Sequence, residues 1–561
     1  MAAIVLASGC GKDFLDPSID RDHTPETMAT SRGTIWDFAN AMYVPIEYGF
    51  TSLNGNLFAA ATDEAQETVP SSEVLTFTQG TISPVNNPLT TRYHYNYEGI
   101  RAVNFFLDYV GNGKGEALLE LNRNLITDQI NYERDMRYLQ YAKAEAAVLK
   151  AYYYGELIKM YGGVPIVEST YQQDPAMRYE RKSYEEVVNY IIEAIDNNIN
   201  DLAPNWNDDV ERRGRFTQDV ALAIKSRVLL YAASKRDNPG IDILKWEAAA
   251  AAADDLIKLG KYTLDSDYGA YFRGSRTIES PETIYAVRKA VSNEPEKLNY
   301  PIGTPGGNSG VTPTHSLVKD YEALTNFTPD PDDPYWGKDP RLGASIVVEG
   351  SDWNGRAISQ MSGYGDDMAK PHASRTGYYL KKFLQPSLDL RQNDEAQHNW
   401  PLYRYAEILL NFAEAANEVG GPNCPGYTLT PMQALQQVRN RASATLPAIN
   451  PAIDQDGFRD RLKRERKLEL AFEGHRYWDL LRWKDAETIL DQPVTGVKIV
   501  RARVDPNDLS SPLYPYPAYF NIEEQDVATR KFDPEKNYYM PFPRSEVAGS
   551  GGLLLQNPGY E

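Results

Sequence analysis

The sequence predicts a mainly α-helical protein, a tetratricopeptide-like array of helix pairs with a loop-rich second part packed on it. Two observations carry this prediction. Segments with helical periodicity recur in pairs, and alanine at their packing positions lets neighbouring helices approach closely, as in tetratricopeptide-like stacks. Residues 263–400, in contrast, carry many Gly, Pro, Asp and Asn and few long periodic runs, so long helices are not expected there.

The first helix pair is predicted at residues 138–161 and 183–199. The earlier segment places alanines and tyrosines on one face and stops at residues 162–165, Gly-Gly-Val-Pro, a glycine stop followed closely by proline. The later segment begins with Ser183 and has Glu186 three residues on, the pattern of a capping box. Both boundaries are therefore specified locally.

Two more pairs follow the same logic. The second is predicted at residues 217–234 and 246–259, and the third at residues 402–419 and 431–441. The spacing between pairs is irregular, so the repeat is degenerate.

The expected organisation is a single unit after a short leader. We expect a residual signal segment at residues 1–10, a helical scaffold at about 28–262 and 401–490, a loop-rich part at about 263–400 and an extended C-terminal segment at 491–561. A loop region as long as 263–400 is usually functional or disordered, and its Tyr and Trp content argues against disorder.

Residues 464–483 mix charged residues and large aromatic groups densely. We expect one helix, with Gly474 as its only breaker and with its charges paired against neighbouring elements. Six residues make its apolar stripe: Leu468, Ala471, Phe472, His475, Trp478 and Leu481.

Composition narrows the functional classes. The formal net charge of −20 repels phosphate backbones, so no nucleic-acid partner is expected. No apolar run approaches the roughly 18 residues of a membrane-spanning helix, so membrane attachment would come from a lipid or a partner. The two cysteines are Cys10 and Cys424, and Cys424 lies in a predicted turn where nothing would activate its thiolate.

Glu465, Glu469 and Glu473 are the carboxylates that an enzyme could use for catalysis. A helical glycosidase needs two carboxyl groups on opposite sides of the scissile bond. At i,i+4 spacing these three are expected to face outward together, with Arg466, Arg476 and Arg482 available to neutralise them. No nucleophile elbow, phosphate loop or zinc motif occurs, so we predict no enzyme, no catalytic residue and no cofactor.

A calcium site is the one metal hypothesis that the sequence leaves open. Asp330, Asp332 and Asp333, or Asp366 and Asp367, could hold Ca²⁺ through oxygen ligands. Their spacing lacks the full calcium-loop pattern, so acidic turn residues in solvent are the preferred interpretation.

Several motifs together resemble one family. They are residues 144–165 around Tyr152-Tyr153-Tyr154, residues 214–217 (Gly-Arg-Phe-Thr), residues 339–341 (Asp-Pro-Arg), residues 377–383, residues 404–410, and the helix at 464–483. In this order they resemble the SusD/RagB family, nutrient-binding lipoproteins of the outer membrane of Bacteroidetes. The resemblance implies a SusD-like fold, four tetratricopeptide-like helix pairs with an irregular second part laid over them.

The chain ends add to the resemblance. Residues 11–17, Gly-Lys-Asp-Phe-Leu-Asp-Pro, are similar to the start of mature SusD-like lipoproteins, and residues 556–560 are similar to the usual close. The resemblance implies that Cys10 is lipidated and that the protein is anchored to the outer membrane at the cell surface. A free cysteine in a disordered tail is the alternative.

The resemblance also implies a function and a partner. The expected function is non-catalytic capture of oligosaccharides and their delivery to a SusC-like TonB-dependent transporter. A RagB-like peptide-binding subunit, an α-helical glycoside hydrolase and a purely structural surface protein are the alternatives. In the family, ligands contact the loop before a Tyr-x-x-Ile-x-x-x-Asn helix, expected here to begin at Tyr97, and the loop-rich part.

Candidate ligand contacts were chosen for an aromatic face or a polar group suited to sugar hydroxyls. Tyrosine supports this choice, with 38 Tyr against 17 Phe, although helix packing accounts for most of them. Tyr93 stands where many relatives have Trp, which leaves the cargo type open. The candidates are Tyr93, His94, Asn308, Trp336, Trp353 and Tyr364.

Overall fold

The computed structural model describes residues 31–51, 53, 55–170, 179–325, 327, 333–441, 446–501 and 520–561. Helices dominate, and the strands pair only two at a time, so the predicted mainly α-helical class is confirmed. Residues 1–30, with Cys10, lie outside the described residues, as do Asp330 and Asp332.

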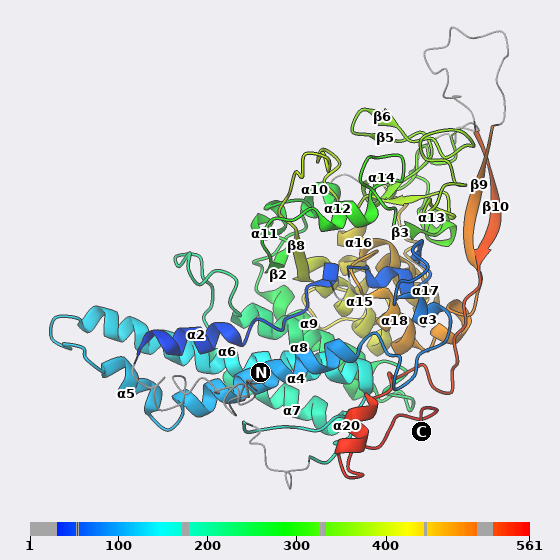
Figure 1. Ribbon diagram of the computed structural model, residues 1–561. Helices are drawn as coiled ribbons and strands as arrows, with labels where there is room; N and C mark the ends of the chain where they lie inside the picture. Colours follow the sequence, from blue (N-terminus) through cyan, green and yellow to red (C-terminus); the bar gives the residue numbers. More distant parts are fainter. Residues whose placement is uncertain are drawn as a thin grey trace, which may run out of the picture.

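The N-terminal half supplies the long helices of an extended layer (Figure 1). Helix α6 runs Gln129–Tyr161 and packs against α4, Thr90–Val110, and against α7, Tyr184–Asn198. The capping box predicted at Ser183 and Glu186 is confirmed, because each side chain bonds the backbone N–H of the other residue. Shorter elements of this half are α2 Gly33–Ala41, η3 Gly49–Thr51, η4 Phe58–Ala61, β1 Ala65–Glu67, α3 Leu75–Thr78, α5 Lys114–Glu120 and η5 Ile199–Asp201.

The second and third predicted pairs are also present. Helix α8, Gln218–Ala233, packs on α9, Ile243–Lys258, and α15, Tyr405–Gly420, packs on α16, Pro431–Arg439, and on α9. The third pair starts later than expected, because residues 402–404 end a strand and do not begin a helix.

Short elements separated by turns make up the loop-rich residues 263–400, which lie over the scaffold helices at one end of the molecule (Figure 1). Strand β2 pairs antiparallel with β8, β1 with β3, β4 with β7, and β5 with β6. The elements are α10 Tyr268–Tyr271, α11 Arg276–Glu279, β2 Thr283–Arg288, α12 Glu294–Asn299, β3 Val311–Pro313, α13 His315–Asp320, α14 Pro340–Ser345, β4 Ile346–Val347, β5 Asp352–Trp353, β6 Arg356–Ala357, β7 Tyr379–Leu380 and β8 Asn399–Arg404.

The single helix expected at residues 464–483 is two helices in the structure. Helix α17 runs Gln455–Glu469 and α18 runs Arg476–Trp483. Between them the backbone is left-handed at Phe472 (φ 67°) as well as at Gly474 (φ 81°). The prediction of one continuous helix was therefore wrong, because a right-handed helix cannot continue through left-handed backbone at Phe472 and Gly474.

The C-terminal segment carries structure that periodicity did not reveal. Strands β9, Val494–Arg501, and β10, Phe520–Ala528, form an antiparallel hairpin along the edge of the loop-rich part, where β9 packs against α13 (Figure 1). Two short helices flank it, α19 at Ala486–Ile489 and α20 at Arg544–Gly549.

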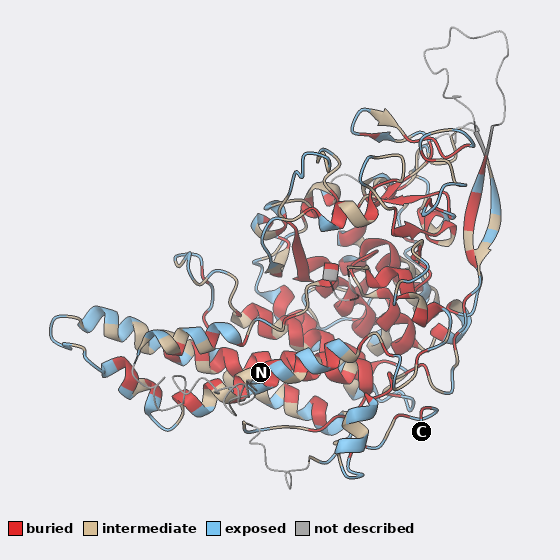
Figure 2. Cartoon of the chain, viewed as in Figure 1, coloured by how far each residue is buried: buried red, intermediate tan, exposed pale blue. Residues whose placement is uncertain are grey.

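One contiguous apolar core holds these parts together. It extends from Ile35 to Tyr560, and buried residues concentrate where the scaffold helices meet (Figure 2). Close approach of α4 to α6 depends on Gly99, because a Cβ there would lie 2.4 Å from the ring of Tyr153. The Tyr153 hydroxyl donates a hydrogen bond to the Met42 carbonyl, so this tyrosine serves packing, the role expected for most of them.

Candidate functional site

An open cavity of about 690 Å³ is lined by α4, from Tyr93 to Asn104, and by α20. Its volume falls within the roughly 300–1,000 Å³ of small-molecule sites. Its walls come from three separated parts of the chain, and the lining residues are Tyr93, His94, Tyr97, Glu98, Ile100, Arg101, Asn104, Pro165, Val167, Ser169, Tyr179, Ser545, Glu546, Gly549, Ser550 and Leu554. Tyrosine, amide, guanidinium, carboxylate and hydroxyl groups therefore converge in one hollow.

Asn104 is the residue of this cavity whose side-chain oxygen is most suited to accept a hydrogen bond from a ligand. It is buried, and its Nδ2 donates to the carbonyl oxygens of Val167, at 3.0 Å, and Ser169, at 3.1 Å. Its Oδ1 has no hydrogen-bond partner among the described residues. An unsatisfied buried acceptor costs about 1–3 kcal/mol, a cost that a ligand hydroxyl would remove.

The rim of the cavity is charged. His94 Nε2 lies 3.6 Å from Glu546 Oε1, and both side chains are half exposed, so this contact spans α4 and α20 without being buried. Glu98 and Arg101 are exposed on the next turn of α4. Because these side chains are in contact with water, a ligand can replace that water at a small cost in desolvation free energy.

Tyr93 and His94 are in α4 itself. The helix starts at Thr90, so the expectation that it begins at Tyr97 was wrong by two turns. Tyr93 is buried against Tyr97 and Tyr161, with ring centroids 4.9 and 5.2 Å apart, and burial raises the pKa of its hydroxyl. It forms the floor of the cavity, and Tyr97, whose hydroxyl donates to Pro165, forms a wall.

The other four candidates lie in the loop-rich part, away from α4 (Figure 1). Asn308 Oδ1 contacts His372 Nδ1 at 2.8 Å, and Tyr364 is partly buried against the core. Trp336 is 57% exposed and packs edge-on against Phe327. Trp353 is 2% exposed and packs against Tyr300, so a ligand would reach its ring only after a rearrangement. The structure thus brings Tyr93 and His94 together and leaves these four apart from them.

Several residues that line the α4 cavity were not predicted from the sequence. Glu546 and Ser545 belong to α20, more than 440 positions after His94, and Tyr179 follows the first helix of the first pair. No spacing rule connects residues so distant. Asn104 could have been predicted as a site residue, because it is the asparagine of the Tyr-x-x-Ile-x-x-x-Asn pattern that begins at Tyr97.

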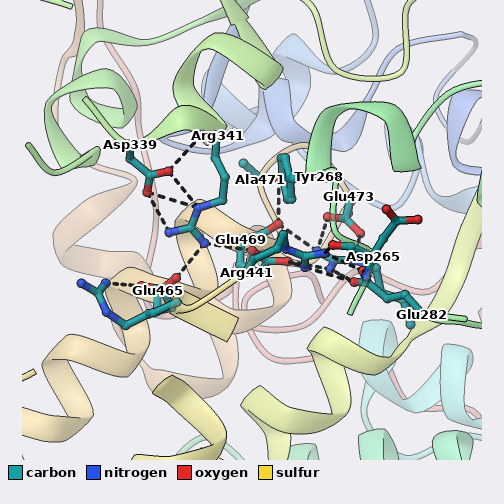
Figure 3. A network of polar contacts seen from close by, with 12 residues as sticks. Asp265, Tyr268, Glu282, Asp339, Arg341, Arg441, Glu465, Glu469, Ala471 and Glu473 are labelled. Atoms are coloured by element: carbon teal, nitrogen blue, oxygen red, sulfur yellow. Dashed lines mark hydrogen bonds and ion pairs between the residues drawn. The ribbon is translucent and has the colours of Figure 1, made fainter. Parts of the chain in front are cut away.

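The three glutamates weighed as catalytic carboxylates belong to a buried ionic network (Figure 3). Glu469 contacts Arg341, Arg404 and Arg441 at 2.6–2.8 Å. Glu465 is held by Arg341 and Arg439. The prediction that these glutamates face outward was wrong, because each is enclosed by guanidinium groups from other elements.

The arginines expected to neutralise those glutamates have other partners. Arg466 pairs with Asp479, Arg476 with Asp63, and Arg482 with Glu414 and Asp479. Lys382 reaches Glu473 at 2.8 Å, and burial lowers its pKa to about 8. The general expectation that the charges pair with neighbouring elements is confirmed, with different partners.

His475 and Glu473 line an internal cavity of about 60 Å³. Burial and nearby cations, Arg227 first among them, hold the pKa of His475 well below its usual range, so the ring is neutral. The space accommodates a few water molecules and no sugar ring. This cavity therefore offers no place for a glycosidic bond.

The described part of the chain holds no group of three or more His, Cys, Asp or Glu side chains placed to bind a metal ion. Asp366 is buried and pairs with Arg356, with Oδ1 3.1 Å from Nη2, and Asp367 accepts hydrogen bonds from backbone N–H groups at Gly363 and Ala369. The expectation of acidic turn residues in solvent was therefore wrong for Asp366, because its carboxylate is buried and neutralised by Arg356. None of the described helices combines the length and apolarity needed to cross a membrane.

The fold defines a tetratricopeptide-like helical-repeat protein with an open cavity of aromatic and polar groups. A family model described as the SusD family matches residues 271–560, and one described as "Starch-binding associating with outer membrane" matches residues 13–230. The chain belongs to the SusD/RagB family, which is associated with carbohydrate binding and nutrient uptake at the outer membrane.

Curated relatives and solved structures agree with this assignment. SusD-like protein P38 of Formosa agariphila is 26% identical over 65% of this chain and 69% of the relative, and SusD-like protein P2 of the same organism is 24% identical over 74% of each. A SusD-like carbohydrate binding protein from Bacteroides fragilis superposes with a TM-score of 0.75 at 23% identity, covering 94% of this chain and all of that one. The surface glycan-binding protein A of Bacteroides fluxus has a TM-score of 0.63 at 20% identity, over 95% of this chain and 100% of that chain.

Proposed function

We propose that the protein is a non-catalytic glycan-binding lipoprotein of the cell surface, which captures oligosaccharides and delivers them to a SusC-like TonB-dependent transporter. Cys10 would carry the lipid anchor. The helical scaffold and the loop-rich part would act as one unit, a proposal supported by the single apolar core that joins them.

The observation that carries the glycan assignment is the α4 cavity with Asn104 in its wall. Sugars present apolar ring faces and hydroxyl groups, which match tyrosine rings and amide, guanidinium and carboxylate groups. The cavity offers both kinds of partner side by side. The unsatisfied Asn104 Oδ1 would accept a hydrogen bond from a sugar hydroxyl.

The non-catalytic part of the proposal follows from the carboxylates. A general acid must be able to release its proton to a ligand. Glu469 is enclosed by three arginines, which hold its pKa well below its usual range against the opposing effect of burial. In the α4 cavity Glu98 is exposed and the side chain of Glu546 is half exposed, so neither carboxyl group lies in the apolar surroundings typical of a general acid.

Calorimetry of the purified protein against a glycan panel and a peptide digest tests the proposal. A glycan should bind, and His94→Ala or Arg101→Ala should weaken it about tenfold, on the order of 1–2 kcal/mol for a charged hydrogen bond. Tyr95→Ala is the matched control, because Tyr95 is exposed on the same helix and does not line the cavity.

The alternatives predict different outcomes. Saturable binding of peptides without any glycan response would replace the sugar by a peptide cargo. Release of reducing ends from a polysaccharide by the purified protein would favour a glycoside hydrolase. A purely structural surface protein would bind neither ligand and would not co-purify with a transporter.

A further inference from the structure

A second open cavity, of about 560 Å³, lies between α2, the turn at residues 211–215 and strand β2. It shares no lining residue with the α4 cavity. Five of its lining side chains are cationic, although the chain as a whole carries a net charge of −20. They are Arg212, Arg213, Arg215, Arg288 and Lys289.

Two of the five cations are neutralised within the fold. Arg215 lies 2.7 Å from the buried carboxylate of Glu145 and also donates to Asn40 Oδ1. Arg212 pairs with Asp209 at 3.1 Å and lies over the ring of Tyr138. These contacts hold both side chains in the cavity wall, and the two carboxylates neutralise the charges of both arginines.

The other three cations have no carboxylate within ion-pair distance among the described residues. Within the described part of the chain, Arg213 donates to the backbone carbonyl of Asn207, and Lys289 Nζ lies 5.8 Å from the ring centroid of Tyr48. Arg288 lies over Gly214, where a Cβ would come 3.7 Å from its Nε. Desolvation lowers the pKa of Arg288, and the charge of Arg213 lowers it further. Both guanidinium groups line the same cavity, so two like charges belong to one site.

The residues that line the cavity, taken together with their ion-pair partners, carry a positive excess. Glu211 is the acidic residue that lines the cavity, and Glu145 and Asp209 are already paired. Five cations against these three carboxylates leave two positive charges. The net negative charge of the protein repels anions at long range, whereas an excess of positive charge in one cavity attracts an anionic group at short range.

Aromatic groups stand beside the guanidinium groups. Trp36, partly buried, lines the cavity, lies edge-on to Tyr138 and has the Arg212 guanidinium group 5.4 Å from its ring centroid. Tyr43 and Tyr285 also line the cavity. Guanidinium groups match carboxylate and sulfate oxygens, whereas aromatic rings match the apolar face of a sugar ring. The two features together select for a sugar that carries a negative charge.

We propose that this arginine-rich cavity binds the carboxylate or sulfate-ester group of an acidic oligosaccharide, and that acidic glycans are therefore the cargo class of the protein. The proposal rests on the proposed function in one respect, that the cargo is a glycan. Arg213 and Arg288 bind the anionic group, and Trp36 contacts the sugar ring.

The test is calorimetry with three oligosaccharides of equal length, one neutral, one containing uronic acid and one sulfated, and with sodium sulfate as a fourth probe. The native protein should bind an acidic oligosaccharide at least tenfold more tightly than the neutral one, and added NaCl should weaken this binding. The double variant R213Q/R288Q should lose at least tenfold of that affinity and most of the salt dependence. Whether the uronate or the sulfated sugar responds identifies the anionic group.

The double variant R134Q/R391Q is the charge-matched control, because both arginines are exposed elsewhere on the surface. It should leave the affinities unchanged, and equal melting temperatures would show that both variants fold. Equal binding of neutral and acidic sugars, or full affinity in R213Q/R288Q, would overturn the proposal and leave the proposed function standing. Binding of sulfate alone, or of no oligosaccharide at all, would overturn both.

Discussion

Arg404 donates two hydrogen bonds of 2.7 Å to the two carboxylate oxygens of Glu473, and both side chains are buried. Arg404 ends strand β8, and Glu473 lies in the turn between α17 and α18. Arg404 also contacts Glu282 and Glu469. One guanidinium group therefore joins the strand pair of the loop-rich part to the C-terminal helices.

Arg404→Ala should lower the free energy of unfolding by about 3–5 kcal/mol, because it leaves buried carboxylates with fewer partners. Denaturant unfolding measures this loss. Arg391→Ala is the comparison, because Arg391 is exposed and pairs with Asp389 at the surface, and it should cost no more than about 1 kcal/mol. Equal effects of the two variants would show that the buried network contributes nothing special to stability.

Removing Trp353 and removing Trp336 should have different effects on stability, because one side chain is buried and the other is exposed. Trp353→Ala should lower the free energy of unfolding by about 3–5 kcal/mol, because Trp353 is buried against Tyr300 and its removal leaves a cavity. Trp336→Ala should change it by less than about 1 kcal/mol, since most of that side chain is in water. If Trp336→Ala nevertheless weakens glycan binding in calorimetry, the ligand extends to the loop-rich part.

The stability of the fold should fall as pH rises through neutrality, partly because of Glu349. Burial raises the pKa of this carboxyl from 4.5 to about 7, and the charge of Asp366 adds to the rise. The folded state therefore keeps a proton that the unfolded state has released. This contribution is fully present below about pH 4.5 and is lost as pH rises through about 7.

Glu349→Gln removes that titration. Its free energy of unfolding relative to the native protein should increase by about 3 kcal/mol between pH 4.5 and pH 8. Chemical unfolding at several pH values measures the difference, and groups common to both proteins cancel. Glu64, whose pKa burial raises to about 8, acts in the same direction in both. A difference that stays constant with pH would contradict the prediction.

Membrane association should depend on Cys10, which lies outside the described residues. Several acyl chains anchor a protein firmly, whereas one alone binds only marginally. Cys10→Ala, expressed with a complete signal sequence, should appear in the soluble periplasmic fraction. A variant that still fractionates with the outer membrane in a strain without the transporter would refute the lipid anchor.

Local signals in the sequence determined where several helices begin and end. The capping box at Ser183 and Glu186 and the glycine stop after Tyr161 act through neighbouring backbone groups, so the sequence alone predicts them. Helical periodicity gave the three helix pairs for the same reason. The break at Phe472 was hidden, because a left-handed non-glycine residue has no reliable sequence signature.

Only the tertiary structure decided which charges pair and which cavities form. Glu469 meets Arg341 and Arg404 across 128 and 65 positions, and His94 meets Glu546 from the other end of the chain. The arginine-rich cavity likewise needs α2, the turn at 211–215 and β2 to converge. Periodicity and capping report on groups a few residues apart, whereas ion pairs and cavities depend on how distant segments pack, so the sequence predicted the scaffold and the folded chain placed the sites on it.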